Sequence, residues 1–332
     1  MDKLTIFGMG LIGSSLGMAL KKAQVKTEIV AFDRDRAVSS RARKAGACDK
    51  VETNPIDAVK GSSMVILSIP MGAMPEVMEF LGPELDDGCI VTDTGSSKAA
   101  VLGWADQYLP QTVSFVGGHP MAGKEISGPE GADPNLYVGA TYCIIPSKNA
   151  GERAVDEVVS LVETVGARPY FIDALEHDSF VAAVSHLPMV LSSALVKLTS
   201  GDPSWPEISR LASSGYRDVT RLASGNPELN RDMCLTNKDS LVHWIDEYVK
   251  ELSEFKELIK SGNDTDIVRV FDDIWEARDR LMQDKVTAPS ASPPIEVPST
   301  AETMGGMVVG DRAAGRIREI LNFFKDDKRK RR

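Results

Sequence analysis

The stretch "LTIFGMGLIGSSLG", residues Leu4–Gly17, joins a short apolar run to three glycines in the spacing GxGxxG. The apolar run predicts a strand, and the residues after the glycines predict a helix because apolar side chains then recur at helical spacing. In such a turn Gly8 permits the tight bend, Gly10 lets a phosphate approach the backbone, and Gly13 lets the helix pack on the strand. The stretch therefore predicts a βαβ unit that binds a dinucleotide at the helix N-terminus.

The second predicted strand, "EIVAFDRD" at Glu28–Asp35, supports this interpretation because it leads into an acidic residue. Asp33 follows Gly13 by twenty residues, where a carboxylate bonds the adenosine ribose hydroxyls and repels a 2′-phosphate. NAD is therefore predicted rather than NADP. Arg34 could pair with a 2′-phosphate if Asp33 turned away, but we interpret it as a surface charge. The predicted cofactor-binding residues are Gly8, Gly10, Leu11, Ile12, Gly13, Asp33, Arg34 and Ser68.

Strand-like and helical patterns alternate along the first half of the chain, which is typical of a mostly parallel sheet covered by helices. Candidate strands are 4–7, 28–32, 64–68, 89–93, 114–116, 140–145 and 168–172. Beyond residue 172 helices are expected at 175–198, 205–223, 226–258 and 265–285. The predicted fold class is α/β: an N-terminal Rossmann-like doubly wound parallel sheet, residues 1–173, followed by an all-helical substrate and dimerisation domain, residues 174–285.

The helical part has a physical reason to form a homodimer. Its apolar stretch "FVAAVSHLPMVLSSALVKL" at Phe180–Leu198 is longer than one small helical layer can cover.

The last segment, residues 286–332, has a different composition. It begins "VTAPSASPPIEVPST" and ends in the basic "KDDKRKRR", so too few apolar groups are present to offset the entropy of ordering. We expect a flexible linker and a solvated tail.

Length, charge and cysteine usage limit the classes of function. At 332 residues the chain exceeds the size of one hydrophobic core, so two domains are expected. The net charge of −10, without a basic stripe in the body of the chain, argues against a nucleic-acid partner, and no apolar run approaches the roughly 20 residues of a membrane span. The four cysteines are scattered, with no CxxC pair for zinc, and the N-terminus carries no secretory signal. We expect a cytoplasmic protein with reduced thiols, a small-molecule substrate and no metal.

Polar groups follow three predicted strands in a row. They occur in "SIPMGAM" from Ser68, in "VTDTGSSKAAV" with Asp93 to Lys98, and in "FVGGHPMAG" with His119. Open α/β sheets bind ligands at the carboxyl ends of their strands, so these groups are expected to line one crevice. A neutral imidazole beside a nicotinamide ring is suited to take the proton of a substrate hydroxyl while hydride leaves the same carbon.

The motifs "GMGLIG", "DTGSSK", "GGHPMAG", "SHLP" and "GYRDVTRLA" occur in this order and together resemble those of the prephenate/arogenate dehydrogenase family of tyrosine biosynthesis. The resemblance covers residues 4 to about 285. It implies oxidative decarboxylation of prephenate by NAD to give 4-hydroxyphenylpyruvate, CO₂ and NADH. It also implies a homodimer formed through the helical domain.

The resemblance also implies roles for individual residues. His119 would accept the hydrogen bond and the proton of the C4 hydroxyl, and Ser96 would bond that hydroxyl or the histidine. Arg221 would hold a substrate carboxylate, which its planar fork fits. The remaining substrate-binding residues would be His186 from the helical domain, Asp218 orienting Arg221, and Glu125 guarding the mouth of the pocket.

Other interpretations stay open at this point. Ser96 could cap a helix that begins at Ser97, and Arg217 could replace Arg221. His177 and His243 have no context that gives them a role. The same chemistry on arogenate is the alternative activity, with Glu125 favouring its ammonium group. A non-catalytic NAD-sensing protein and a reductase of hydroxy acids or imines are further alternatives; the former would be expected to lose His119 or Arg221.

Overall fold

The computed structural model describes residues 2–124, 126 and 128–286. These residues fall into two compact units, the first ending at Leu241 and the second beginning at Val242. Glu125 and the tail from residue 287 onward lie outside the described residues. Every other predicted site residue belongs to the first unit.

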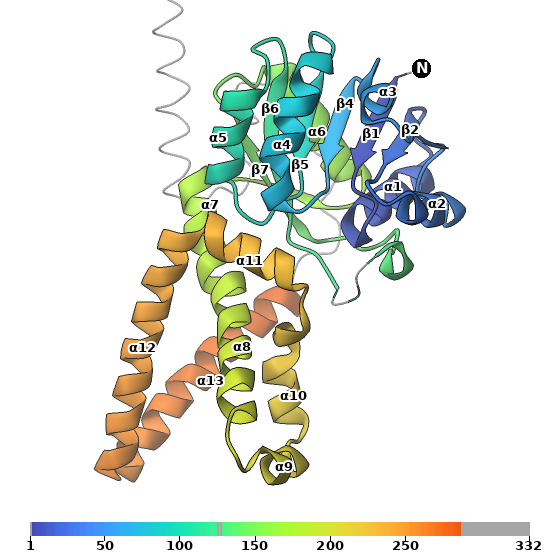
Figure 1. Cartoon of the computed structure of the whole chain (residues 1–332). Helices are drawn as coiled ribbons and strands as arrows, with labels where there is room; N and C mark the ends of the chain where they lie inside the picture. Colours follow the sequence, from blue (N-terminus) through green and yellow to red (C-terminus); the bar gives the residue numbers. More distant parts are fainter. Residues whose placement is uncertain (1, 125, 127, 287–332) are drawn as a thin grey trace, which may run out of the picture. The chain divides into compact units, whose positions relative to one another are not determined.

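The first unit is built on one sheet of eight strands in the order β3-β2-β1-β4-β5-β6-β7-β8 (Figure 1). All neighbouring strands are parallel except β6 and β7, which are antiparallel. The chain starts in the middle at β1, moves outward to β3 and crosses back to β4, which makes the sheet doubly wound as predicted. The bounds are β1 Lys3–Phe7, β2 Glu28–Phe32, β3 Lys50–Val51, β4 Met64–Leu67, β5 Ile90–Asp93, β6 Ser114–Pro120, β7 Thr141–Pro146 and β8 Arg168–Phe171.

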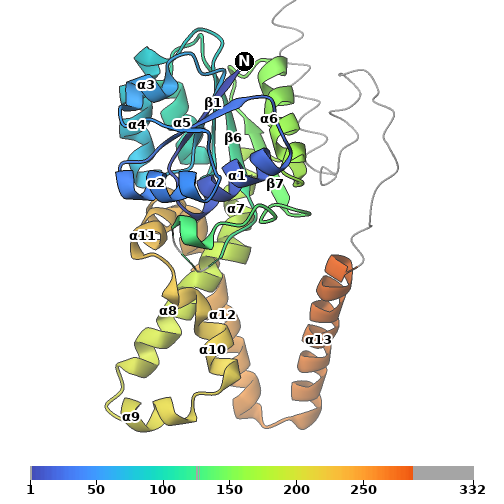
Figure 2. The ribbon, with the colours of Figure 1, turned by 90° about the vertical axis from the view of Figure 1, so that its right-hand side faces the viewer.

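Helices cover both faces of this sheet because successive strand residues point to opposite sides. In β4, Met64 and Ile66 pack in a core cluster with α1, α2 and α6, whereas Val65 and Leu67 pack with α3, α4 and α5. Figure 2 shows α4 and α6 on opposite sides of the strands. The bounds are α1 Leu11–Lys22, α2 Arg36–Lys44, α3 Pro55–Val59, α4 Met74–Leu81, α5 Ala99–Tyr108 and α6 Glu152–Thr164.

A run of helices follows β8, as predicted, but it is divided more finely than periodicity indicated. The expected helix 205–223 consists of α9, two 3₁₀ turns and α10, because backbone at Ser213 is extended beside the turn-favouring Ser214 and Gly215. The expected helix 226–258 is divided at Asn237, which leaves helical geometry. The bounds are α7 Ala174–Val181, α8 Leu187–Ser200, α9 Trp205–Ile208, α10 Ser214–Thr220, α11 Pro227–Thr236, α12 Lys238–Ser261 and α13 Asp264–Val286.

A π-helical turn, Ala182–His186, joins α7 to α8 in one continuous helix. Pro188 explains it: the proline nitrogen cannot donate to the carbonyl of Val184, and its ring crowds that carbonyl. The wider backbone of the π turn relieves this conflict. It also sets the direction in which the side chain of His186 projects from the helix.

By length and composition, the continuous helix Ala174–Ser200 is apolar enough to cross a membrane, although no apolar run of that length was expected from the sequence. The same helix carries His177, Asp178 and His186, all buried and hydrogen-bonded to other parts of the first unit. We therefore interpret it as the internal helix of a folded domain.

The second unit contains most of α12 and α13. The rings of Phe255 and Phe271 meet at a centroid distance of 6.0 Å and pack the two helices together. Large apolar side chains stay exposed on both helices: Val249, Leu252, Ile259, Val268, Phe271, Ile274, Trp275 and Leu281.

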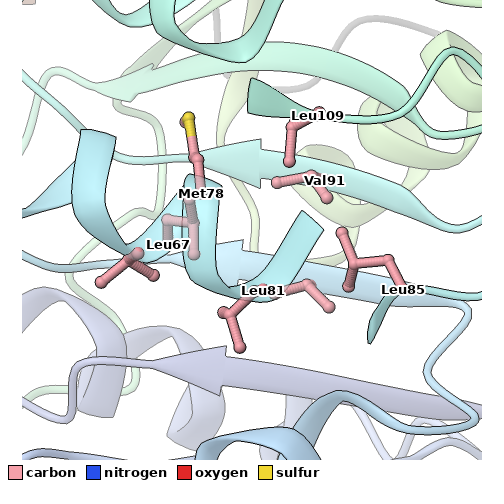
Figure 3. Close-up of a pocket in the computed structure, with 8 residues that line it drawn as sticks. Leu67, Met78, Leu81, Leu85, Val91 and Leu109 are labelled. Atoms are coloured by element: carbon pink, nitrogen blue, oxygen red, sulfur yellow. The ribbon is translucent and has the colours of Figure 1, made fainter. Parts of the chain in front are cut away.

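One small cavity, of about 10 Å³, lies between α4 and the sheet (Figure 3). It is lined only by apolar side chains, including Leu67, Met78 and Val91. Its volume is marginal for one water molecule and no polar partner lines it, so it is a packing defect of the core and not a ligand site.

Candidate active site

The glycine loop has the geometry that a bound dinucleotide requires. Gly8 has φ +89°, and a Cβ there would lie 2.1 Å from the carbonyl oxygen of Ser68. A Cβ on Gly13 would lie 2.0 Å from the carbonyl oxygen of Gly8, so both glycines are required by the fold itself. A Cβ on Gly10 would meet no atom within 4 Å. The backbone at Gly10 therefore borders open space at the start of α1, where a pyrophosphate fits.

Asp33 is held at the end of β2 by the same loop. Its carboxylate accepts hydrogen bonds from the backbone N–H of Met9 at 2.8 Å and of Asp35 at 2.9 Å. Arg34 beside it is exposed, and the next residue, Asp35, caps α2.

The remaining predicted cofactor residues also lie on this edge. Leu11 and Ile12 are half-buried and open α1, and Ser68 accepts a hydrogen bond from Thr94 at 3.3 Å, which joins the ends of β4 and β5. The residues around the loop thus fit a dinucleotide.

His119 lies on β6 opposite Cys143 of β7, whereas the predicted strand stopped at residue 116. The two glycines before it allow close packing: a Cβ on Gly118 would lie 2.5 Å from the carbonyl oxygen of Asp93. The imidazole is 9% exposed, so it is nearly enclosed at the carboxyl end of the strand. Because β1, β4, β5 and β6 are parallel, this end of β6 lies on the same edge of the sheet as the glycine loop.

A buried ion pair fixes the backbone beside His119. Lys98 and Asp93 are fully buried and paired, and Lys98 Nζ also donates to the carbonyl oxygen of Gly118 at 2.7 Å. The Asp93 carboxylate accepts from the N–H of Gly118 at 3.1 Å and of Gly95 at 2.7 Å. The polar groups of "DTGSSK" were expected to line the crevice, but these two side chains instead bind β5, β6 and the start of α5 together.

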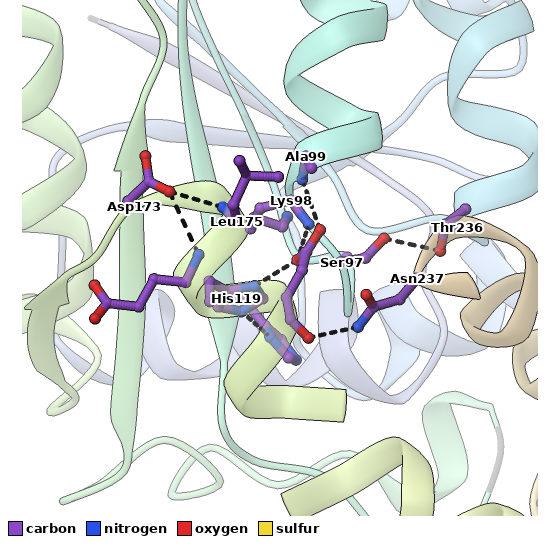
Figure 4. A network of polar contacts seen from close by, with 12 residues as sticks. Ser97, Lys98, Ala99, His119, Asp173, Leu175, Thr236 and Asn237 are labelled. Carbon is purple, nitrogen blue, oxygen red and sulfur yellow. Dashed lines mark hydrogen bonds and ion pairs between the residues drawn. The ribbon is translucent and has the colours of Figure 1, made fainter. Parts of the chain in front are cut away.

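The imidazole of His119, which Figure 4 labels within a network of polar contacts, is hydrogen-bonded to a second histidine. His119 Nδ1 lies 2.9 Å from His177 Nε2, and His177 Nδ1 lies 2.8 Å from Asp178 Oδ1. Asp178 Oδ1 also accepts from the N–H of Lys98 at 2.7 Å, and its Oδ2 accepts from the N–H of Ala99 at 2.9 Å. The carboxylate therefore sits on the N-terminus of α5, where free N–H groups and the helix dipole favour negative charge.

His186 is completely buried close to this pair. Asn237 Nδ2 donates to the carbonyl oxygen of Asp178 at 2.6 Å and lies 3.2 Å from His186 Nδ1. An amide N–H donor requires an acceptor at Nδ1, so the proton of a neutral His186 is on Nε2. Among the residues that the structure describes, His186 Nε2 has no hydrogen-bond partner. A buried N–H group without an acceptor destabilises the folded protein. Such a group is expected where a bound ligand supplies the acceptor.

Burial keeps both imidazoles neutral. It lowers the pKa of His119 well below its usual range, and the neighbouring His177, Lys98 and His186 lower it further. Burial also lowers the pKa of His186 to about 4, with Asp178 opposing the shift. At neutral pH His119 is therefore an uncharged hydrogen-bond acceptor, as a general base must be.

Two contacts dock α11 on the carboxyl edge of the sheet. The hydroxyl of Ser97 donates a hydrogen bond to that of Thr236 at 2.8 Å. The carboxylate of Asp232 accepts one from the backbone N–H of Gly72 at 2.8 Å. These contacts and the Asp178 cap hold the helical run over the strand ends within the first unit.

The other predicted substrate residues are distributed around this centre. Ser96 is half-buried. Among the described residues it makes no hydrogen bond to His119 or to the backbone of α5. That helix begins at Ala99 with Lys98 as its N-cap, so the alternative that Ser96 caps a helix from Ser97 is wrong. Asp218 is exposed on α10. Arg221 is exposed on the 3₁₀ turn Arg221–Ser224, which packs against α8.

Comparison with known proteins agrees with this arrangement. The nucleotide-binding domain of prephenate dehydrogenase matches residues 16–171, and the prephenate dehydrogenase dimerization domain matches residues 173–273. Prephenate dehydrogenase of Bacillus subtilis is 32% identical over 282 residues, which are 84% of this chain and 76% of the relative. The chain belongs to the prephenate dehydrogenase family.

Solved structures of the prephenate dehydrogenase family share its fold. Prephenate dehydrogenase from Aquifex aeolicus in complex with hydroxyphenyl propionate and NAD⁺ is 29% identical, with a TM-score of 0.79 over 85% of this chain and 98% of that one. Arogenate dehydrogenase from Synechocystis is also 29% identical, with a TM-score of 0.71 over 84% of this chain and 99% of that one.

Three members of the buried network were not predicted from the sequence: His177, Asp178 and Asn237. One signal was present for the first two, because a His-Asp pair lies near the start of a helix that is mostly apolar. Buried polar groups of this kind need partners, so the pair indicated a tertiary contact. Asn237 carried no comparable signal.

Proposed function

We propose that this chain catalyses the NAD-dependent oxidative decarboxylation of prephenate to 4-hydroxyphenylpyruvate in tyrosine biosynthesis. The observation that carries the proposal is the buried, neutral His119 at the end of β6, on the same sheet edge as the glycine loop. Relatives with this activity in their names share 32% of the sequence over most of the chain. The chain is thus an oxidoreductase with NAD as its cofactor.

The reaction conserves atoms and charge. NAD⁺ supplies the hydride acceptor for the hydrogen on C4 of the ring. His119 Nε2 accepts the hydrogen bond of the C4 hydroxyl and holds its proton while the C4–H bond breaks. The ring carboxylate leaves as CO₂, its bonding electrons complete the aromatic ring, and the proton returns to the oxygen, which becomes the phenol of the product.

The family resemblance assigns the surrounding residues. In this proposal Arg221 binds a substrate carboxylate, His186 donates a hydrogen bond from its Nε2–H to the substrate, and Ser96 hydrogen-bonds the C4 hydroxyl or His119. The unpartnered Nε2 of His186 supports its role directly. Asp218 orients Arg221, and Glu125 guards the pocket mouth.

Arogenate is the alternative substrate. It differs from prephenate in bearing an amino group in place of the side-chain keto group, so the ring chemistry at His119 is unchanged. The likeness to Synechocystis arogenate dehydrogenase favours testing it. A preference for arogenate would point to an acidic residue near the side chain of the substrate, with Glu125 as the candidate.

We propose that the working enzyme is a homodimer formed through the helical domain, residues 174–285. The match of residues 173–273 to a dimerization domain supports this. So do the exposed apolar side chains of α12 and α13, among them Phe271, Ile274 and Trp275, because such patches on soluble proteins mark interfaces. Size-exclusion chromatography with light scattering tests the proposal, and a monomer at micromolar concentration would contradict it.

We propose two domain assignments that follow from the sequence. Residues 1–173 form the dinucleotide-binding domain and residues 174–285 form the substrate and dimerisation domain; the tail predicted for residues 286–332 lies, from residue 287 onward, outside the described residues. The protein works in the cytoplasm, which four free cysteines, three of them buried, favour.

The test of function is NADH formation by the purified protein with NAD and either prephenate or arogenate, repeated with NADP. Turnover of prephenate with NAD is the expected result. Faster turnover of arogenate would replace the substrate and keep the chemistry. No turnover with either substrate, in a protein that still binds NAD, would overturn the proposal.

A further inference from the structure

His177 contacts the imidazole of His119 directly, and Asp178 contacts His177. Both are almost fully buried, and the rings of His119 and His177 meet nearly edge to face, with an interplanar angle of 71° and a centroid distance of 5.1 Å. The two residues belong to α7, whereas His119 belongs to β6, so the contact joins the helical run to the sheet.

Asp178 determines which way the hydrogen bonds run. A carboxylate can only accept hydrogen bonds. That of Asp178 already accepts hydrogen bonds from the backbone N–H groups of Lys98 and Ala99 at the start of α5. The atom that faces it on His177 is Nδ1, which must therefore carry a proton. In a neutral ring the other nitrogen is then an acceptor, so His177 Nε2 accepts from His119 Nδ1. His119 keeps its lone pair on Nε2.

We propose that His177 and Asp178 are positioning residues, which hold His119 in the Nδ1–H tautomer and fix its ring so that Nε2 is the hydrogen-bond acceptor for the substrate hydroxyl. The inference rests on the proposed function and assigns residues to which the family motifs gave no role. It also explains a buried carboxylate on a helix N-terminus: α5 anchors Asp178, Asp178 orients His177, and His177 orients the base.

Kinetic variants separate positioning from simple packing. His177→Phe keeps a ring of similar size and removes both hydrogen bonds, so kcat should fall about 10²-fold or more while the KM for prephenate and the Kd for NAD stay within about threefold. His177→Gln can accept from His119 and donate to Asp178, so it should recover kcat to within about tenfold of wild type. Asp178→Asn places an amide donor against His177 and should reduce kcat by about 10² to 10⁴.

Asp173→Asn is the matched control for the carboxylate. Asp173 caps the same helix, α7, by accepting from the N–H of Leu175 at 2.9 Å, and it is not part of the His119 network. Asparagine also caps helices, so activity and stability should both be unchanged. If Asp178→Asn behaves like this control, Asp178 is only a cap and the proposal is wrong.

A spectroscopic readout is independent of turnover. The chain has only four histidines, so ¹⁵N-histidine NMR spectra of wild type, His119→Asn and His177→Phe identify the signals of His119 and His177. Both should carry their proton on Nδ1 in wild type, and His119 should become a tautomer mixture in Asp178→Asn. A proton on Nε2 of His119 in wild type would overturn the proposal.

Each outcome separates this inference from the function on which it rests. Wild-type kcat in a folded His177→Phe variant would also overturn the positioning role. If His177→Phe does not fold, the His177→Gln variant and the wild-type spectrum decide. If wild type turns over neither prephenate nor arogenate, the proposed function fails, and the spectrum still shows whether Asp178 sets the tautomer of His119.

Discussion

The glycine loop and the histidine site lie on the same edge of one sheet, but they are constructed differently. The loop is recognised from residues close in sequence, and its requirements are steric: a Cβ on Gly8 would overlap the carbonyl oxygen of Ser68, and a Cβ on Gly13 would overlap that of Gly8. The histidine site is formed by residues from β5, β6, α5 and α7, together with Asn237 after α11. Two of its contacts join residues 58 and 80 positions apart, His119 with His177 and Lys98 with Asp178.

This difference has an energetic consequence. A loop that binds through backbone N–H groups has few charged side chains to desolvate. The histidine site buries an ion pair, a carboxylate and three imidazoles, whose polar atoms need hydrogen-bond partners inside the protein. We therefore expect substitutions in the histidine site to change catalysis and stability together more often than exposed substitutions nearby.

The largest effect is expected for His119→Asn. Loss of a positioned base should reduce kcat by about 10² to 10⁴, while substrate and NAD still bind, because the imidazole acts in the transition state. Steady-state kinetics with prephenate, together with fluorescence titration of NAD, make the measurement. Wild-type turnover in a correctly folded variant would remove His119 from the mechanism.

The buried ion pair should have the next largest effect. Lys98→Met leaves Asp93 buried without its cation, which should lower the free energy of unfolding by about 3 to 5 kcal/mol. Lys21→Met is the matched control, because Lys21 pairs with Asp49 at the surface and its loss should cost less than about 1 kcal/mol. Urea denaturation measures both values, and equal losses would show that the buried pair has no special role in holding β5 and β6.

The two regions also differ in how far sequence could predict them. The strand, the GxGxxG turn and Asp33 follow from local spacing, and the doubly wound sheet follows from alternating strands and helices; these predictions of fold are confirmed. The short strand Lys50–Val51 was missed because two residues carry no period. The breaks at Ser213 and Asn237 were missed because turn chemistry and a tertiary contact outweigh helical periodicity there.

The candidate site was predictable only in part. His119 and His186 stand in recognisable motifs, and both lie in the buried network. The motif around Lys98 predicted a polar crevice, but Lys98 and Asp93 satisfy each other inside the protein. Which buried polar groups become partners depends on how α7 lies over the strand ends. No local pattern specifies that geometry, so the His119–His177–Asp178 contacts required the structure.

A smaller effect is expected from pH. His186 has a pKa of about 4 when folded, against about 6.5 when unfolded, so between these values the unfolded chain binds more protons. The free energy of unfolding should therefore fall as the pH drops through this range, by about 2 kcal/mol from His186 alone between pH 7.5 and 5. Burial of His119 acts in the same direction.

Urea denaturation at both pH values tests this dependence. In the His186→Gln variant no imidazole titrates at this position, so the pH dependence should be smaller by about 2 kcal/mol. An unchanged pH dependence in that variant would show that folding does not lower the pKa of His186.

The smallest effect is expected on the exposed side of the site, for Arg221→Gln. Loss of one charge-assisted contact to a substrate carboxylate should raise KM roughly tenfold and change kcat little, because the same contact exists before and during the reaction. Arg217→Gln is the matched control, because Arg217 lies four residues earlier and is also exposed. Its KM should be unchanged. If KM rises in Arg217→Gln and is unchanged in Arg221→Gln, Arg217 binds the carboxylate in this protein, in place of the arginine that the family motif indicates. If neither variant changes KM, substrate binding depends on the buried imidazoles alone, and the contrast between buried and exposed parts of the site is sharper than proposed.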